Sequence, residues 1–193
     1  MAATKPEGSA RDRLLAAANE LFYEEGVHTV GIDRVIERAG VAKASLYSTF
    51  GSKDGLVRAY LSGRADTRRQ RIERWMARYD NPRDRILGIF DALGEAIAVS
   101  PFRGCALMNA SAEVPRRDTP VNQVCSDARA WQRDLLVGLL RELGVADPEP
   151  LGRQIQALYD GATVAAAMDR DVAAAATARA AASVLLDAHA PRA

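Results

Sequence analysis

The sequence predicts an all-α protein, because helical periodicity runs through most of its 193 residues while the signals of strands are nearly absent. Apolar residues recur at three- and four-residue spacing, whereas alternating Val, Ile and Thr runs and hairpin dipeptides are scarce. Hydrophobic residues make up 48% and charged residues 26% of the chain, which is typical of a globular protein with a substantial core. The length suits one larger domain or two small ones.

Three helices are predicted before residue 53, and each ends at a glycine. The expected ends are Gly26, Gly40 and Gly51, since glycine commonly follows a helix in the left-handed conformation. Apolar stripes support these helices: Leu14, Leu15, Ala18, Leu21 and Phe22 in the first, Ile32, Val35, Ile36 and Ala39 in the second, and Leu46 and Phe50 in the third.

A long fourth helix is predicted from Lys53 to about Ala77, with Ser52 as its N-cap. Asn81 and Pro82 then mark a new start, because Asn caps helices well and Pro suits the first helical position. The later helices are predicted over residues 82–99, 105–113, 120–144 and 148–168, with a ninth after Asp171.

Charge and cysteine content narrow the classes of protein. The formal net charge is +1, so any contact with nucleic acid must rest on locally placed groups rather than on a global field. No stretch approaches the ~18 apolar residues of a membrane span, and the N-terminal segment lacks the apolar centre of a signal peptide. The two cysteines, Cys105 and Cys125, are too few for a disulfide framework, so we expect a protein of the reducing cytoplasm.

The stretch "RVIERAGVAKASLYSTFGSKDGL", from Arg34 to Leu56, contains two short helical patterns joined by a glycine turn. Two helices joined in this way form a helix-turn-helix. Gly40 permits the turn, and apolar contacts would hold the two helices at a fixed crossing angle. The residues expected to make those contacts are Val35, Ile36, Val41 and Leu46.

The second helix of this motif would present short polar groups, one methyl group, one cation and one phenol to the outside. This set suits the base edges and phosphates of a DNA major groove. Lys53 begins the next helix, where backbone amides favour an anion such as a phosphate. A short helix with Ser and Thr outward is also common as a plain solvated face. The outward residues are Lys43, Ala44, Ser45, Tyr47, Ser48 and Thr49.

The region from Arg11 to Leu56 resembles the N-terminal DNA-binding domain of TetR-family transcriptional regulators. The resemblance lies in "AAANELFYEEG", in "GIDRVIERAGVAKASLYSTFGSKDGLV" and in the spacing between them, about a quarter of the chain. Gly31 stands where the family usually has Thr or Ser, and Ala42 stands where a Ser often caps the helix. Each departure loses a hydroxyl that could bond a backbone amide or a phosphate.

The resemblance implies a role for each residue of the motif. Tyr47 and Lys53 would contact phosphates, while Leu46 and Phe50 would lie in the core; Tyr47 could instead pack its ring against the first helix. It implies an N-terminal arm and helix-turn-helix domain over 1–53 and a helical effector-binding and dimerisation domain over 54–193. The residues expected to read bases are Lys43, Ala44, Ser45, Ser48 and Thr49.

Small residues gather on one face of the helix predicted over 148–168. Ala157, Gly161 and Ala165 recur every four residues, with Ala162 beside them. Glycine inside a helix costs up to ~1 kcal/mol relative to Ala, so it is best tolerated where another backbone approaches closely. A face of small residues therefore suits a close helix–helix interface. The resemblance implies that the last two helices pair with their mates as a four-helix bundle; the alternative is packing within one chain.

The stretch "PFRGCALMNASAE" resembles the lining of a ligand pocket. Its polar groups stand among apolar neighbours, as in pockets where a few polar groups orient the ligand. The alternative is that Asn109 and Glu113 cap loops or pair with arginines. The candidate effector-binding residues are Cys105, Asn109 and Glu113 at four-residue spacing, Met108 beside them, and Phe102, Trp131, Tyr159 and Met168 as walls.

Catalysis finds little support, since no glycine-rich phosphate loop or metal-ligand cluster is visible and the only histidines are His28 and His189. We expect no catalytic residue, cofactor or metal. The hypothesis is a dimeric repressor that binds a palindromic double-stranded DNA operator, is released by a small-molecule effector and has no membrane partner. The alternatives are a regulator sensing redox state through Cys105 and Cys125, or a small-molecule-binding helical protein or thiol enzyme without DNA binding.

Overall fold

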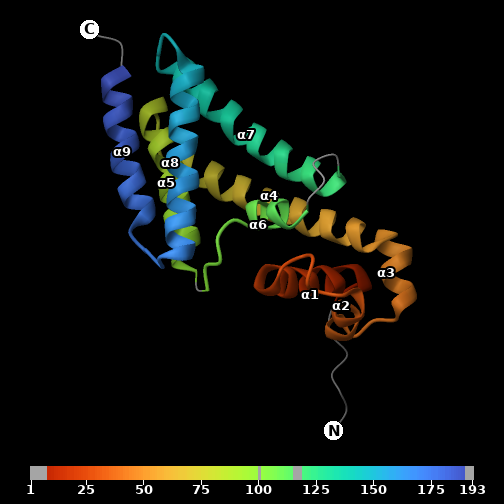
Figure 1. Ribbon diagram of the computed structural model, residues 1–193. Coiled ribbons are helices and arrows are strands. Elements are labelled where there is room, and N and C mark those ends of the chain that lie inside the picture. The colour runs from red at the N-terminus through yellow and green to blue at the C-terminus, as the bar shows by residue number, and fades with distance from the viewer. Residues whose placement is uncertain (1–7, 100, 115–118, 190–193) are drawn as a thin grey trace. The chain divides into compact units, whose positions relative to one another are not determined.

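The computed structural model describes residues 8–99, 101–114 and 119–189, and within these ranges all regular secondary structure is helical (Figure 1). The predicted helices are confirmed in number and order, with ends that differ by a few residues at most. They are α1 (Ala10–Glu25), α2 (Ile32–Ala39), α3 (Lys43–Phe50), α4 (Lys53–Met76), α5 (Pro82–Ala98), α6 (Ala106–Glu113), α7 (Pro120–Glu142), α8 (Pro148–Met168) and α9 (Ala174–His189).

The chain forms two compact units. Unit 1 comprises the residues up to Ala65 together with Ala106–Ser126, and unit 2 comprises Asp66–Cys105 together with the residues from Asp127 onward. Helices α4 and α7 therefore contribute to both units.

This division differs from the boundary expected between residues 53 and 54. The first half of α4 belongs to unit 1 because its apolar face is buried there, and the Tyr60 ring meets the Phe22 ring edge-on with centroids 5.6 Å apart. The buried residues of this half-helix are Leu56, Val57, Tyr60 and Leu61.

In unit 1, α1 packs against both α2 and α3. Leu14, Val35 and Leu46 contribute one fully buried side chain from each helix. The turn between α2 and α3 depends on Gly40, whose φ of 61° lies in the left-handed region that favours glycine. Arg13 of α1 donates from Nη1 to the Gly40 carbonyl at 3.1 Å, which fixes the turn against α1.

The helix starts of unit 1 are capped unequally. Ser9 and Asp12 form a reciprocal capping box at the start of α1. Gly31 and Ala42 occupy the N-cap positions of α2 and α3, and neither provides a side-chain cap. The structure thus confirms that the two departures noted in the sequence fall at helix N-caps.

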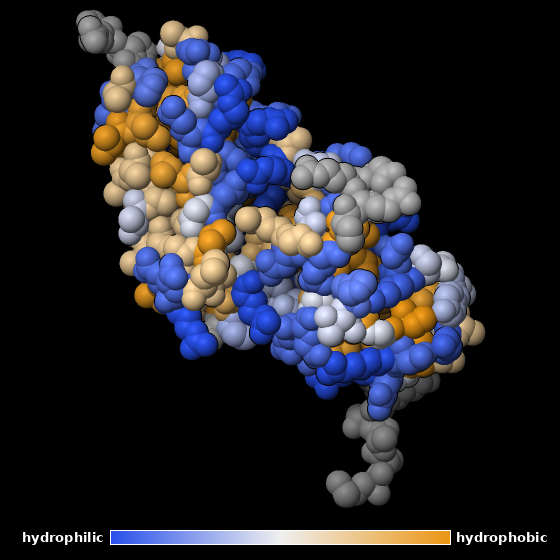
Figure 2. All heavy atoms as spheres, viewed as in Figure 1, coloured by the Kyte–Doolittle hydropathy of each residue, from blue (hydrophilic) through white to orange (hydrophobic). Residues whose placement is uncertain are grey.

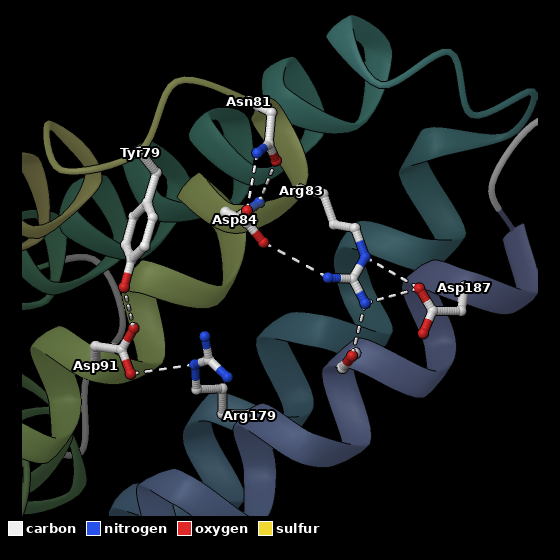
Figure 3. A network of polar contacts seen from close by, with 8 residues as sticks. Tyr79, Asn81, Arg83, Asp84, Asp91, Arg179 and Asp187 are labelled. Carbon is white, nitrogen blue, oxygen red and sulfur yellow. Dashed lines mark hydrogen bonds and ion pairs between the residues drawn. The ribbon is translucent and has the colours of Figure 1, made fainter.

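In unit 2, α5, α8 and α9 pack side by side (Figure 1). A polar network joins α5 and the loop before it to α9 (Figure 3). Arg83 donates from Nη2 to Asp187 at 2.7 Å. Asp91 accepts from the Tyr79 hydroxyl at 3.0 Å and forms an ion pair with Arg179, whose Nε lies 3.1 Å from Oδ1. The apolar core beneath includes Phe90, Ile86, Leu140, Leu151 and Leu186.

Among the described residues, no helix has both the length and the apolar character needed to cross a membrane.

Candidate nucleic-acid interface and small-molecule site

The outward face of α3 is polar and exposed, while its inner face anchors the helix. Tyr47 is 45% exposed, whereas Leu46 beside it is fully buried. This orientation disfavours the packed alternative for the Tyr47 ring. Lys43, Ala44, Ser48 and Thr49 are also exposed, and Ser45 is half-buried.

The Lys43 ammonium at the start of α3 pairs with Asp33 of α2, with Nζ and Oδ1 2.9 Å apart. The hydrogen bond with Asp33 raises the pKa of Lys43, so the group stays positively charged at neutral pH. Both side chains are largely exposed, so water and salt screen the pair and it contributes little to stability. The ammonium can therefore exchange Asp33 for another acceptor at little cost.

Lys53 lies at the start of α4, half-buried, and its Nζ donates to the His28 carbonyl at 3.3 Å. The backbone amide of His28 donates to the Glu113 carboxylate of α6 at 2.7 Å. The loop between α1 and α2 is thus held by two side chains from elsewhere in unit 1.

Glu113 therefore lies against this loop, which is one of the two arrangements left open by the sequence. Gly26 makes room for it: a Cβ there would stand 2.8 Å from the carboxylate oxygens, and the φ of 95° also favours glycine. The expected stripe is divided, because α6 begins at Ala106 and leaves Cys105 in unit 2. Asn109 and Met108 lie exposed on α6 in unit 1.

The other candidate effector residues belong to unit 2. Phe102 and Trp131 are half-buried and pack against its core, and the Tyr159 ring lies 6.1 Å from that of Phe90. Burial raises the pKa of the Tyr159 hydroxyl, so this group is a neutral donor at physiological pH. Cys105 has a free thiol whose Sγ accepts from Arg68 Nη1 at 3.8 Å.

Sequence reasoning missed the polar side chains that gather with Tyr159. Arg68 and Arg71 lie in the "RRQR" run of α4, where alternating charges are typical of a solvated surface, yet both are half-buried. Gln132 and Gln156 interrupt the apolar faces of α7 and α8, and that interruption was the available signal. Both glutamines are buried.

An apolar stripe runs along the outside of α8 and α9. Ala157 and Gly161 are exposed, and they share a face of α8 with Val164 and with Met168, which is 78% exposed. Val184 adds an exposed apolar side chain on α9, and Figure 2 shows orange and tan atoms at the surface over α9. The expected dimer residues differ in position: Ala162 lies in the core of unit 2, and Ala165 is half-buried.

No group of three or more His, Cys, Asp or Glu side chains within the described ranges could hold a metal ion. The two cysteines lie in different units, Cys105 in unit 2 and Cys125 in unit 1, and both are free thiols.

Comparisons with known proteins agree with this architecture. The model of the family described as bacterial regulatory proteins, tetR family, matches residues 14–60. A TetR-family transcriptional regulator from Streptomyces coelicolor, SCO4454, is 32% identical, with 94% of this chain and 96% of that chain covered and a TM-score of 0.89. This chain belongs to the TetR family. It is a DNA-binding transcriptional regulator.

The curated HTH-type relatives include both an activator and a repressor of transcription. The transcriptional activator FasR of Mycolicibacterium smegmatis is 43% identical over 61 residues, which cover 32% of this chain and only 28% of FasR. The transcriptional repressor KstR2 of the same organism is 29% identical over 140 residues, covering 72% of this chain and 66% of KstR2.

Proposed function

We propose that this TetR-family protein is a dimeric repressor that binds a palindromic operator through α3 and leaves it when a small molecule binds. The observation that carries the proposal is the outward face of α3. Its side chains are exposed while Leu46 anchors the helix beneath them. A recognition helix needs this combination, because base contacts require groups held at fixed positions.

Two kinds of contact are proposed for this face. Lys43, Ala44, Ser45, Ser48 and Thr49 would read base edges, since they offer a cation, hydroxyls and a methyl group. Tyr47 and Lys53 would contact phosphates. Lys53 has three donors and uses one on the His28 carbonyl, so it can bind a phosphate at the start of α4 without leaving the loop.

The proposed dimer forms through the stripe on α8 and α9. Exposed apolar side chains gathered on one side of a helix are typical of protein interfaces. Ala157 and Gly161 would allow close approach of the helices, and a Cβ at Gly161 would meet no atom within 4 Å in the isolated chain. Val164, Met168 and Val184 would supply apolar area.

A gel-shift titration tests the DNA proposal, with operator sequences selected from random DNA. We expect an inverted repeat whose half-site centres lie about 34–36 Å apart, or a multiple of that spacing. Lys43→Ala should weaken binding by about 1–3 kcal/mol if it contacts a base bidentately. Lys53→Ala should weaken all sequences alike and lower the salt slope by about one.

Arg133→Ala is the control, because Arg133 is an exposed cation on α7 in unit 2. Loss of binding in this control, or a selection that yields no inverted repeat, would contradict the proposal. Repression is tested with a reporter placed behind the selected operator: deletion of the gene should raise reporter output, and a fall would indicate an activator.

A further inference from the structure

Unit 2 contains buried polar side chains whose hydrogen bonds are incomplete. Gln132 is 1% exposed, and its Nε2 has no hydrogen-bond partner among the described residues. Gln156 is 6% exposed; its Nε2 donates to Asp160 at 3.0 Å, but its Oε1 likewise lacks a partner there. Buried polar groups in proteins are nearly always paired, so two such amides in one unit call for an explanation.

Two arginines in the part of α4 that belongs to unit 2 share this property. Arg68 donates to the Ala128 carbonyl at 3.0 Å and to Cys105 Sγ, yet its buried Nε is without a partner in the described part of the chain. The buried Nε of Arg71 is also unpaired within the described ranges. Neither guanidinium forms an ion pair with a carboxylate of the described residues, although the charge of Arg71 acts on the Glu95 carboxylate and lowers its pKa.

The contacts bring these groups together. Gln132 follows Ala128 by one helical turn, so it lies on the face of α7 that Arg68 reaches. Gln156 and Tyr159 lie three residues apart on α8, and the charges of both arginines act on the Tyr159 hydroxyl. We call this group the polar cluster; it comprises Arg68, Arg71, Cys105, Gln132, Gln156 and Tyr159.

The polar cluster offers mainly donors and positive charge. Two carboxylates act on members of the cluster, and both already have partners: Asp160 pairs with Arg129 and accepts from Gln156, and Glu95 accepts from Arg74 and from the Trp75 indole. Guanidinium groups match carboxylates in geometry, and a buried charge is costly until it is paired. Aromatic rings lie in the same unit: Phe90 contacts Tyr159, and the half-buried Trp131 packs against the core with Arg69 over its ring.

We propose that the polar cluster binds the carboxylate of a small organic acid, with Arg68 and Arg71 pairing with its charge and Gln132 and Tyr159 donating to its oxygens. The apolar body of the acid would pack against aromatic side chains such as Phe90 and Trp131. This inference rests on the proposed function, because it assigns a chemical class to the effector. A buried water that completes the amide hydrogen bonds is the competing explanation.

Calorimetry on the full chain tests the class of ligand. The probes are sodium octanoate and sodium benzoate. Octanamide and benzamide are their neutral analogues, and phenyl phosphate is an anion of a different class. We expect at least one carboxylate to bind with a Kd of roughly 1 mM or tighter and its amide to bind at least about tenfold more weakly. Binding of neither carboxylate, equal binding of the amides, or binding of phenyl phosphate alone overturns the inference.

Two variants test the assigned residues. Gln132→Leu removes an unpaired amide and nearly conserves volume, so stability of the free protein should be unchanged or higher while acid binding weakens about ten- to hundredfold. Arg68→Met should weaken acid binding by a similar factor, and Arg68→Lys should restore part of it. Gln70→Leu is the control, because Gln70 is an exposed glutamine on α4 in unit 2.

A destabilised Gln132→Leu protein that binds the acid normally would overturn the inference and favour the buried water. Operator binding is measured on the same proteins by gel shift. Intact operator binding without any acid binding refutes the acid and leaves the proposed regulator standing. Acid binding without operator binding refutes the regulator and leaves the acid site standing.

Discussion

The two units of this chain place their polar side chains in opposite ways. In unit 1, the polar face of α3 points to solvent above the fully buried Leu46. In unit 2, Gln132 and Gln156 are buried with polar atoms that lack partners among the described residues. Exposed groups on a rigid frame can meet a large partner arriving from solvent, whereas buried unpaired groups suit a small partner that enters the unit.

The largest change in stability is expected when Leu46, which anchors the α3 face, is truncated. Leu46→Ala should lower the free energy of unfolding by about 2–5 kcal/mol, because Leu46 is fully buried and a cavity would remain. Operator binding should fall with it. Thr49→Ala, on the exposed side of the same helix, should change stability by no more than about 0.5 kcal/mol. Urea unfolding measures both, and equal losses would contradict the anchor role.

The second test concerns the loop between α1 and α2. Glu113→Ala removes the acceptor of the His28 amide, and hydrogen bonds to charged groups contribute about 1.5–3 kcal/mol, so we expect a loss near the lower value at this partly exposed site. Hydrogen exchange at the His28 amide should accelerate. Glu113→Gln keeps an acceptor without the charge and should lose less. Unchanged exchange in the alanine variant would show that the contact is not formed in solution.

Glu113 also shows where sequence reasoning reached its limit. The helix order, the glycine ends and the uncapped positions Gly31 and Ala42 could be predicted, because these depend on residues a few positions apart. The contact between Glu113 and His28 joins residues 85 positions apart. Helical spacing placed Glu113 on a face but could not say which distant loop that face would meet.

The polar cluster was missed for a related reason. Arg68 and Arg71 lie in a run rich in charge, and local pattern predicts exposure for such residues. Their burial follows from packing of α4 against elements distant in sequence, as the bond from Arg68 to the Ala128 carbonyl shows. The α3 face was predictable because a helix-turn-helix is a local motif, whereas a site assembled from several helices is not.

A third test adds the cap that α3 lacks. The backbone at Ala42 is extended, with φ −71° and ψ 147°, which is the conformation of a helix N-cap. Ala42→Ser should therefore raise the free energy of unfolding by about 1 kcal/mol. Thermal unfolding measures the gain; a decrease would show that the serine cannot reach the backbone amides of α3.

A fourth test uses pH in unit 2. Arg74 and the Trp75 indole both donate to Glu95, and these hydrogen bonds lower its pKa below the ordinary value of 4.5. A carboxylate with a lowered pKa stabilises the fold above its unfolded pKa, and this contribution is lost as pH falls through the folded value. Glu95→Gln should cost about 0.5–1 kcal/mol at pH 7 and much less near pH 3. A loss of equal size at both pH values would exclude the ionised carboxylate as its cause.

The smallest change in stability is expected at the rim of the α3 face. Asp33→Asn removes the carboxylate that pairs with Lys43, and stability should hardly change because the pair is exposed and screened by water and salt. Operator affinity should rise, because the Lys43 ammonium loses its partner and one negative charge is removed from the face that is proposed to meet the DNA phosphates. The salt dependence should become steeper by up to about one charge. Glu24→Gln removes an exposed acid on α1 and is the control; it should change neither operator affinity nor its salt dependence appreciably.

Gel shifts over a range of salt concentrations compare the two variants with the unmodified protein. Weaker operator binding by Asp33→Asn would show that Asp33 positions Lys43 for its base rather than competing for it.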